Sequence, residues 1–128
     1  LIIDSESSIP IDVFGSEPVH NWCYYFQKAD LAREKQQWEN IMHLWNEAIN
    51  HNLKPSYGPE YLPFIEGALH TGNLELALEL TNDANQTKDM QSFLCTTWSR
   101  LIKEVPDNIE NQDALIRATS GLNCINVF

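Results

Sequence analysis

Apolar residues recur three and four positions apart through most of the chain, as they do along one face of an α-helix. Short polar, glycine- or proline-containing turns separate these stretches. We therefore expect an all-α domain with six helices over residues 19–35, 38–50, 59–70, 74–84, 88–104 and 107–121. The inward-facing positions of the fifth helix are predicted to be Met90, Phe93, Leu94, Thr97, Trp98, Leu101 and Ile102.

The ends of the central helices are indicated by residues with restricted backbone preferences. Asn52 tolerates the left-handed conformation that often ends a helix, and Pro55 cannot continue one. Pro63 is accepted only in a first turn, so regular helix should begin near Tyr61. Gly72 stands where the chain must turn tightly, and we expect a positive φ there.

The last two helices have their own boundary signals. The Val105–Pro106 dipeptide stops the fifth helix. Asp107 followed by Glu110 matches a capping pair for the sixth helix, and Gly121 is expected to end it. The tail over residues 122–128 is apolar, so we expect it to pack back onto these helices.

One pattern is present twice in the sequence, 36 residues apart. The matched pairs are Tyr25 and Tyr61, Ala32 and Ala68, Gln36 and Gly72, Trp38 and Leu74, Ile41 and Ala77, and Ala48 and Ala84. Self-similarity at such a period is typical of stacked helical hairpins. Three antiparallel hairpins account for residues 19–121, and the third matches the repeat poorly, as expected of a terminal pair with one neighbour.

This pattern resembles the tetratricopeptide repeat (TPR), which has small residues where paired helices cross, Gly at the turn within a hairpin and Pro after the second helix. The corresponding residues here are Ala29, Ala32, Ala48, Pro55, Gly72, Ala77 and Ala84, and the segment 72–77 is the best match. Gln36 and Ile41 depart from the expected Gly and Ala, and Pro55 falls late. The resemblance covers residues 22–84 and implies a short, right-handed, TPR-like solenoid.

The TPR family binds peptides on its concave face, which is lined by the first helix of each hairpin. The resemblance places on that face Cys23, Phe26, Asp30, Arg33, Glu34, Leu62, Glu66, Leu69 and His70. A groove with three carboxylates around apolar side chains would suit an apolar segment that carries a basic residue. The simpler alternative is that these residues are solvated surface and ordinary core, because two hairpins form only a shallow groove.

The segment over residues 20–32 is also similar to part of the TPR-like domains at the end of bacterial multi-spanning membrane proteins, some of them glycosyltransferase-like. This likeness implies that the chain is the soluble, extracytoplasmic end of such a protein. It would then support a larger protein without containing the active site. The chain begins at Leu1 without Met, so we expect it to be a piece of something longer.

The composition narrows the possible partners. With 8 Lys and Arg against 18 Asp and Glu, the 128-residue chain has a formal net charge of −10. This charge argues against nucleic-acid binding, which requires cationic side chains on phosphates, and against docking on an anionic lipid surface. No stretch approaches the roughly 20 apolar residues that span a bilayer.

We expect two regions. Residues 1–18 are predicted to be an extended arm or linker, because β-branched residues and prolines dominate there. In the alternative, Ile9, Ile11 and Phe14 lie along the helices as a strap. Residues 19–128 form the helical domain.

The three cysteines leave at least one unpaired. Cys23 and Cys95 both have apolar helical neighbours in the sequence, so we expect both to be buried thiols. A disulfide to Cys124 is the alternative for a domain outside the cytoplasm, and the sequence does not fix the pairing.

No residue pattern predicts a metal, cofactor or catalytic site. His20 and Cys23 could share a helix face, but a zinc site needs three or four converging ligands. Asp30, Glu34 and Glu66 could act as paired acid–base groups. However, no nucleophile or phosphate-binding motif accompanies them.

The function that we expect is non-catalytic. The chain would serve protein–protein interaction or scaffolding as an accessory part of a larger bacterial membrane protein, with a protein, a peptide or the rest of its parent chain as partner. One alternative is a glycan-processing or hydrolytic enzyme domain that uses the acidic groove. The other is a purely structural spacer.

Overall fold

The computed structural model describes residues 20–125. The predicted arm at residues 1–18 and the end of the tail, residues 126–128, lie outside the described residues. Within them the chain is all-α, with six α-helices, two short 3₁₀ helices and no strand, which confirms the predicted fold class. The elements are α1 (Trp22–Glu34), α2 (Trp38–Asn50), η1 (Gly58–Tyr61), α3 (Leu62–His70), α4 (Leu74–Ala84), α5 (Gln91–Leu101), η2 (Ile102–Glu104) and α6 (Ile109–Leu122).

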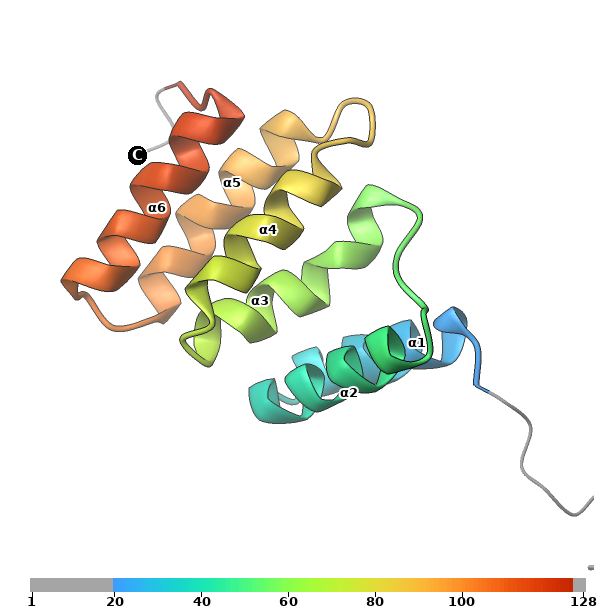
Figure 1. Ribbon diagram of the computed structural model, residues 1–128. Coiled ribbons are helices and arrows are strands. Elements are labelled where there is room, and N and C mark those ends of the chain that lie inside the picture. The colour runs from blue at the N-terminus through green and yellow to red at the C-terminus, as the bar shows by residue number, and fades with distance from the viewer. Residues whose placement is uncertain (1–19, 126–128) are drawn as a thin grey trace, which may run out of the picture.

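The helices are stacked in pairs (Figure 1). Within the pairs, α1 packs on α2, α3 on α4 and α5 on α6. Between the pairs, α3 contacts both α1 and α2, and α4 contacts α6. The first and last pairs therefore lie at opposite ends of the stack, with α3 and α4 between them.

Small residues let the first two pairs approach closely. Ala29 and Ala32 on α1 and Ala68 on α3 are buried, and the two helices contact each other. On α3, a Cβ atom at Gly67 would lie 2.7 Å from Cγ2 of Ile41 on α2. Carbon atoms pack at about 3.5–4.0 Å, so only glycine allows this spacing between α2 and α3.

The 36-residue sequence repeat is also a repeat of local structure. Gln36 and Gly72, the matched turn residues, both have positive φ, at 57° and 80°. The third residue after the end of α1 and after the end of α3 bonds back in the same way. The Gln37 N–H donates to the Ala32 carbonyl at 2.9 Å, and the Asn73 N–H donates to the Ala68 carbonyl at 2.8 Å. The predicted positive φ of Gly72 is confirmed, and the first turn has the same backbone with a different residue.

The third pair packs differently from the first two, because α3 contacts both helices of the preceding pair whereas the third pair contacts α4 mainly through α6. Trp98 on α5 is fully buried, and its indole N–H donates to the Thr81 hydroxyl on α4 at 2.9 Å. This bond links α5 to α4, whereas the close backbone contact of α4 with the third pair is made by α6.

Two sequence predictions for α5 are wrong. The helix begins at Gln91 rather than at Lys88, because Asp89 adopts a left-handed conformation with φ of 66° that no helix continues. Phe93 is 43% exposed, whereas it was predicted to face inward. The other predicted inward residues Met90, Leu94, Thr97, Trp98 and Leu101 are buried.

The predicted ends of α6 also need correction. Asn108 rather than Asp107 caps the helix, with its side-chain oxygen accepting from the Asn111 N–H at 2.8 Å. Gly121 lies inside the helix, which continues to the buried Leu122 and ends at a left-handed asparagine, Asn123, with φ of 57°. The helix continues one residue further and includes the buried leucine, and asparagine tolerates the left-handed conformation that often ends a helix.

Two of the three cysteines form a disulfide, and the third is a free thiol. Cys95 on α5 bonds to Cys124 after α6 and so holds this part of the predicted tail against the last pair. Cys95 is buried as predicted but is not a thiol. Cys23 was predicted to be buried and is exposed, because it lies off the stripe of α1 that faces the core.

Candidate partner-binding cleft

Side chains from four α-helices and one 3₁₀ helix line a polar hollow of about 440 Å³, which we name the cleft. Its residues come from α1 and the following turn, the start of α2, α3, and the end of α5 with η2. They are Arg33, Glu34, Gln36, Trp38, Glu66, His70, Arg100 and Glu104. The cleft therefore joins all three helix pairs.

A buried carboxylate lies at the centre of the cleft. Glu66 is only 2% exposed, and its Oε2 is 3.7 Å from Nη1 of Arg33 and 3.3 Å from Nη2 of Arg100. A buried charge is costly without partners, and the two guanidinium groups supply them from α1 and α5. Burial raises the pKa of the Glu66 carboxyl above its ordinary value, while Arg100 and Arg33 oppose that rise.

Each arginine also binds a second, more exposed carboxylate. Arg33 donates to Asp30 Oδ1 through Nη2 at 2.8 Å and Nε at 3.1 Å. Arg100 donates through Nη1 to Glu104 Oε2 at 3.1 Å. The result is a chain of alternating charges across α1, α3, α5 and η2, which fixes both guanidinium groups in place.

An aromatic pair forms one wall. The rings of Trp38 and His70 are stacked with their centroids 4.0 Å apart and their planes 5° from parallel. His70 Nε2 lies 3.0 Å from Glu104 Oε1. The imidazole therefore contacts Trp38 through its ring face and Glu104 through a ring nitrogen. This wall therefore connects the start of α2 to the end of α3 and to η2.

Carboxylates outnumber cations in the cleft. Glu34, Glu66 and Glu104 line it together with two arginines, and Asp30 adjoins Arg33. Because the arginines are already engaged, the exposed Glu34 at the rim is the charge most accessible to an incoming group. The local field therefore favours a cation over an anion.

Four of the predicted groove residues, Arg33, Glu34, Glu66 and His70, line the cleft. Asp30 joins them through its ion pair. Phe26 and Leu62 are half-buried one helical turn before Asp30 and Glu66, outside the lining of the cleft. Leu69 is 1% exposed, so it belongs to the core and offers no surface to a partner.

Sequence reasoning missed Gln36, Trp38, Arg100 and Glu104. The first two stand at the turn between α1 and α2, where the repeat was visible but was used only to place helices. Adding the 36-residue period to Glu66 points to position 102 rather than to Arg100. The third pair has shifted relative to the repeat, so no signal in the sequence located its contribution.

No protein-family model, curated protein or solved structure matched the chain. Over residues 20–125, no group of three or more His, Cys, Asp or Glu side chains is arranged to hold a metal ion. None of the helices in the described part is long and apolar enough to cross a bilayer.

Proposed function

We propose that this chain is a non-catalytic protein-interaction domain that binds a polypeptide segment carrying a basic residue in the cleft. The observation that carries the proposal is the arrangement around Glu66. One buried carboxylate holds arginines from α1 and α5, so that three helix pairs present a single ordered surface. A site whose polar groups are fixed before binding loses less entropy when a partner arrives.

The excess of carboxylates in the cleft favours a partner with a basic side chain. A Lys or Arg side chain would meet Glu34 at the rim and would extend the alternating chain of charges rather than interrupt it. An acidic segment would meet the same carboxylates with like charge and would be repelled. The Trp38–His70 stack supplies a flat surface for the aliphatic part of such a side chain.

The architecture is proposed to be TPR-like. The matched φ values at Gln36 and Gly72 and the matched hydrogen bonds after α1 and α3 support a shared hairpin unit. We further propose that the chain is an accessory, extracytoplasmic part of a larger bacterial membrane protein. The Cys95–Cys124 disulfide supports the extracytoplasmic location, because such bonds persist in oxidising compartments.

The hydrolytic alternative has less support. An acid–base pair needs carboxylates that can reach a substrate, and Glu66 is buried between two arginines. Asp30 is already paired with Arg33. Scaffolding requires no such access, so we favour it.

Panning a random peptide library against the described domain tests the proposal. We expect the enriched peptides to carry Lys or Arg beside apolar residues. Their affinity should fall about fivefold or more when Glu34→Lys reverses the accessible charge at the rim, because a repulsion replaces an attraction of about 1 kcal/mol. Glu66 is not the residue to change, since a lysine there would place a third cation beside Arg33 and Arg100.

The matched control is Glu79→Lys, which makes the same change of charge at an exposed position on α4 that does not line the cleft. Peptide affinity should be nearly unchanged in that variant. The proposal fails if the selected peptides lack basic residues, or if both variants weaken binding equally.

A further inference from the structure

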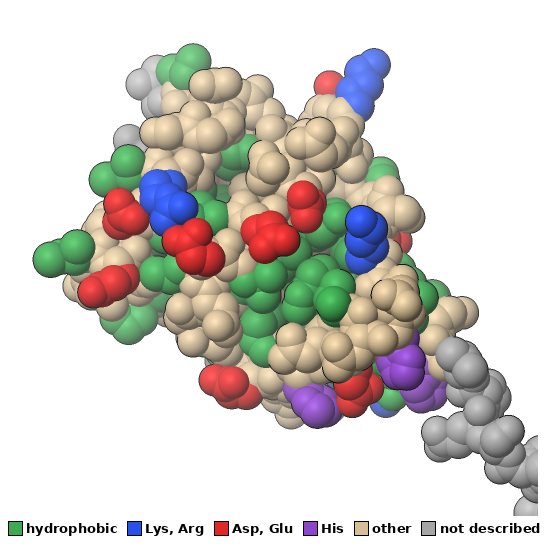
Figure 2. Space-filling model, viewed as in Figure 1, with side chains coloured by type: hydrophobic (Ala, Val, Ile, Leu, Met, Phe, Trp, Pro, Cys, Tyr) green, Lys and Arg blue, Asp and Glu red, His purple; other side chains and the backbone are tan. Residues whose placement is uncertain are grey.

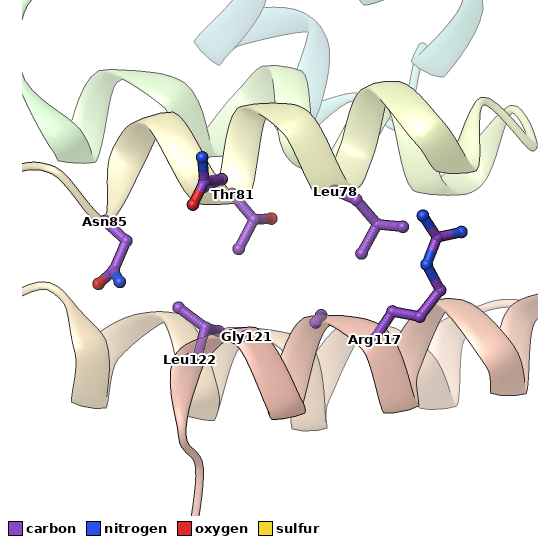
Figure 3. Close-up of a pocket in the computed structure, with 8 residues that line it drawn as sticks. Leu78, Thr81, Asn85, Arg117, Gly121 and Leu122 are labelled. Carbon is purple, nitrogen blue, oxygen red and sulfur yellow. The ribbon is translucent and has the colours of Figure 1, made fainter.

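A second hollow lies between α4 and α6 and shares no residue with the cleft (Figure 3). Its volume is about 220 Å³, the space of roughly seven liquid water molecules. From α4, Leu78, Thr81 and Asn85 point toward α6, and Arg117 and Leu122 point back from α6. The full lining is Leu78, Thr81, Asn82, Asn85, Arg117, Ala118, Gly121 and Leu122, which we name the α4–α6 pocket.

Two small residues of α6, Ala118 and Gly121, leave room in the α4–α6 pocket. A Cβ atom added at Gly121 would meet no atom within 4 Å. The contrast with Gly67 is direct, since a Cβ there would lie 2.7 Å from Ile41. Glycine closes the contact between α2 and α3, whereas between α4 and α6 glycine and the neighbouring Ala118 leave room for a ligand.

Two side-chain amides line the α4–α6 pocket without a hydrogen-bond partner in the described part of the chain. The exposed Asn82 lies on α4 and the half-buried Asn85 directly follows its last residue, and neither amide makes a side-chain hydrogen bond within residues 20–125. The Thr81 hydroxyl is already occupied, because it donates to the Ala77 carbonyl and accepts from Trp98. Each asparagine offers a donor and an acceptor, so the pair suits a ligand with both.

The charges around the pocket disfavour an anion. Arg117 is held by Glu75 through two hydrogen bonds of 2.7 and 3.2 Å, so it is not free to bind a carboxylate. Exposed Glu79 and Asp83 follow Glu75 along α4, and Figure 2 shows acidic side chains grouped over this face. An uncharged ligand avoids both the repulsion and the need to displace Glu75.

We propose that the α4–α6 pocket binds a small, uncharged molecule that joins an apolar body to a carboxamide. The apolar body contacts Leu78, Ala118 and Leu122, and the carboxamide exchanges hydrogen bonds with Asn82 and Asn85. The site lies on α4 and α6, and it operates whether or not the cleft binds a polypeptide.

Three probes of one shape and different charge test the chemistry: benzamide, benzoate and benzamidine. Each is titrated into ¹⁵N-labelled protein while the side-chain amide signals of Asn82 and Asn85 are followed by NMR. Benzamide should shift both signals saturably, with a dissociation constant on the order of 1 mM for a ligand of this size. Benzoate has no hydrogen-bond donor and meets the acidic face with like charge, so it should bind at least fivefold more weakly. Benzamidine has no acceptor for the asparagine N–H groups, so it should also bind more weakly than benzamide, although the acidic face offsets part of that loss. Equal binding of all three, or no saturable shift with benzamide, would overturn the proposal.

A filling variant locates the site. Gly121→Leu adds a side chain at a lining position where a Cβ meets no atom within 4 Å, and it should weaken benzamide binding at least tenfold. Ser120→Leu adds the same side chain at an exposed neighbouring position and should leave affinity unchanged. If Gly121→Leu alters the circular dichroism spectrum, Asn82→Leu with Asn85→Leu provides the second test. Benzamide bound with full affinity by either pocket variant would refute the assignment.

Discussion

Reduction of the Cys95–Cys124 disulfide should lower the free energy of unfolding by about 3.6 kcal/mol. The bond joins residues separated by 29 positions. Closing a loop of that length removes about 12 cal/mol/K of entropy from the unfolded chain, which gives the stated value near 25 °C. Small domains are stable by about 5–15 kcal/mol, so the bond would account for a large share of the total.

Urea unfolding followed by far-ultraviolet circular dichroism measures this contribution. The protein should carry Cys23→Ser, because the exposed free thiol could otherwise exchange with the disulfide. With a urea dependence of about 1–3 kcal/mol/M, reductant should lower the midpoint by roughly 1–3 M. Cys95→Ala with Cys124→Ala should reproduce that shift without reductant. Equal midpoints in the oxidised and reduced protein would refute the loop-entropy reasoning.

Two further predictions concern single residues. Gln36→Gly should stabilise the protein and Gly72→Ala should destabilise it, each by about 1 kcal/mol, because both positions have positive φ. Thermal unfolding checks this pair, and shifts of the same sign would contradict it. Glu66→Gln should stabilise the protein more, or destabilise it less, near pH 7 than near pH 4. Burial raises the folded-state pKa of Glu66, so the wild type loses stability as pH rises through that value, and glutamine does not titrate. Urea midpoints of both proteins at the two pH values measure the difference, and a difference independent of pH would exclude this effect.

The first two helix pairs were accessible to sequence reasoning because local and tertiary signals agree there. The predicted bounds of the second and fourth helices match α2 and α4, and the predicted start of regular helix near Tyr61 matches the change from η1 to α3. In these segments the apolar stripe, the turn residue and the period of the repeat all indicate the same boundaries. Agreement between levels of this kind is what makes a segment predictable.

The third pair was less accessible because its arrangement depends on packing. Trp98 fits the inward stripe of a helix, but the sequence does not show that its indole bonds to Thr81 on α4. Glycine often follows the end of a helix, so Gly121 was predicted to end α6. The helix instead includes the next residue, Leu122, which is buried. The cleft was hard to predict for the same reason, because the residues that α5 and η2 contribute to it do not follow the 36-residue period.

The candidate site was foreseen in part for the same reason. Arg33, Glu34, Glu66 and His70 lie on the two first helices that the repeat identifies, and all four line the cleft. The burial of Glu66 between two arginines could not be read from the sequence, because Arg100 is 34 positions away. Conversely, Leu69 follows the same stripe but points into the core.

Gly67 has a consequence for recognition even though no partner could touch it. It is next to Glu66 in sequence and faces Ile41, so the distance from α2 to α3 is set from behind the cleft. A single methyl group at that position would push α3 away from α2 and alter the separation of the two guanidinium groups that Glu66 holds. The width of the cleft that a partner meets therefore depends on the absence of a side chain at a buried neighbouring position of α3.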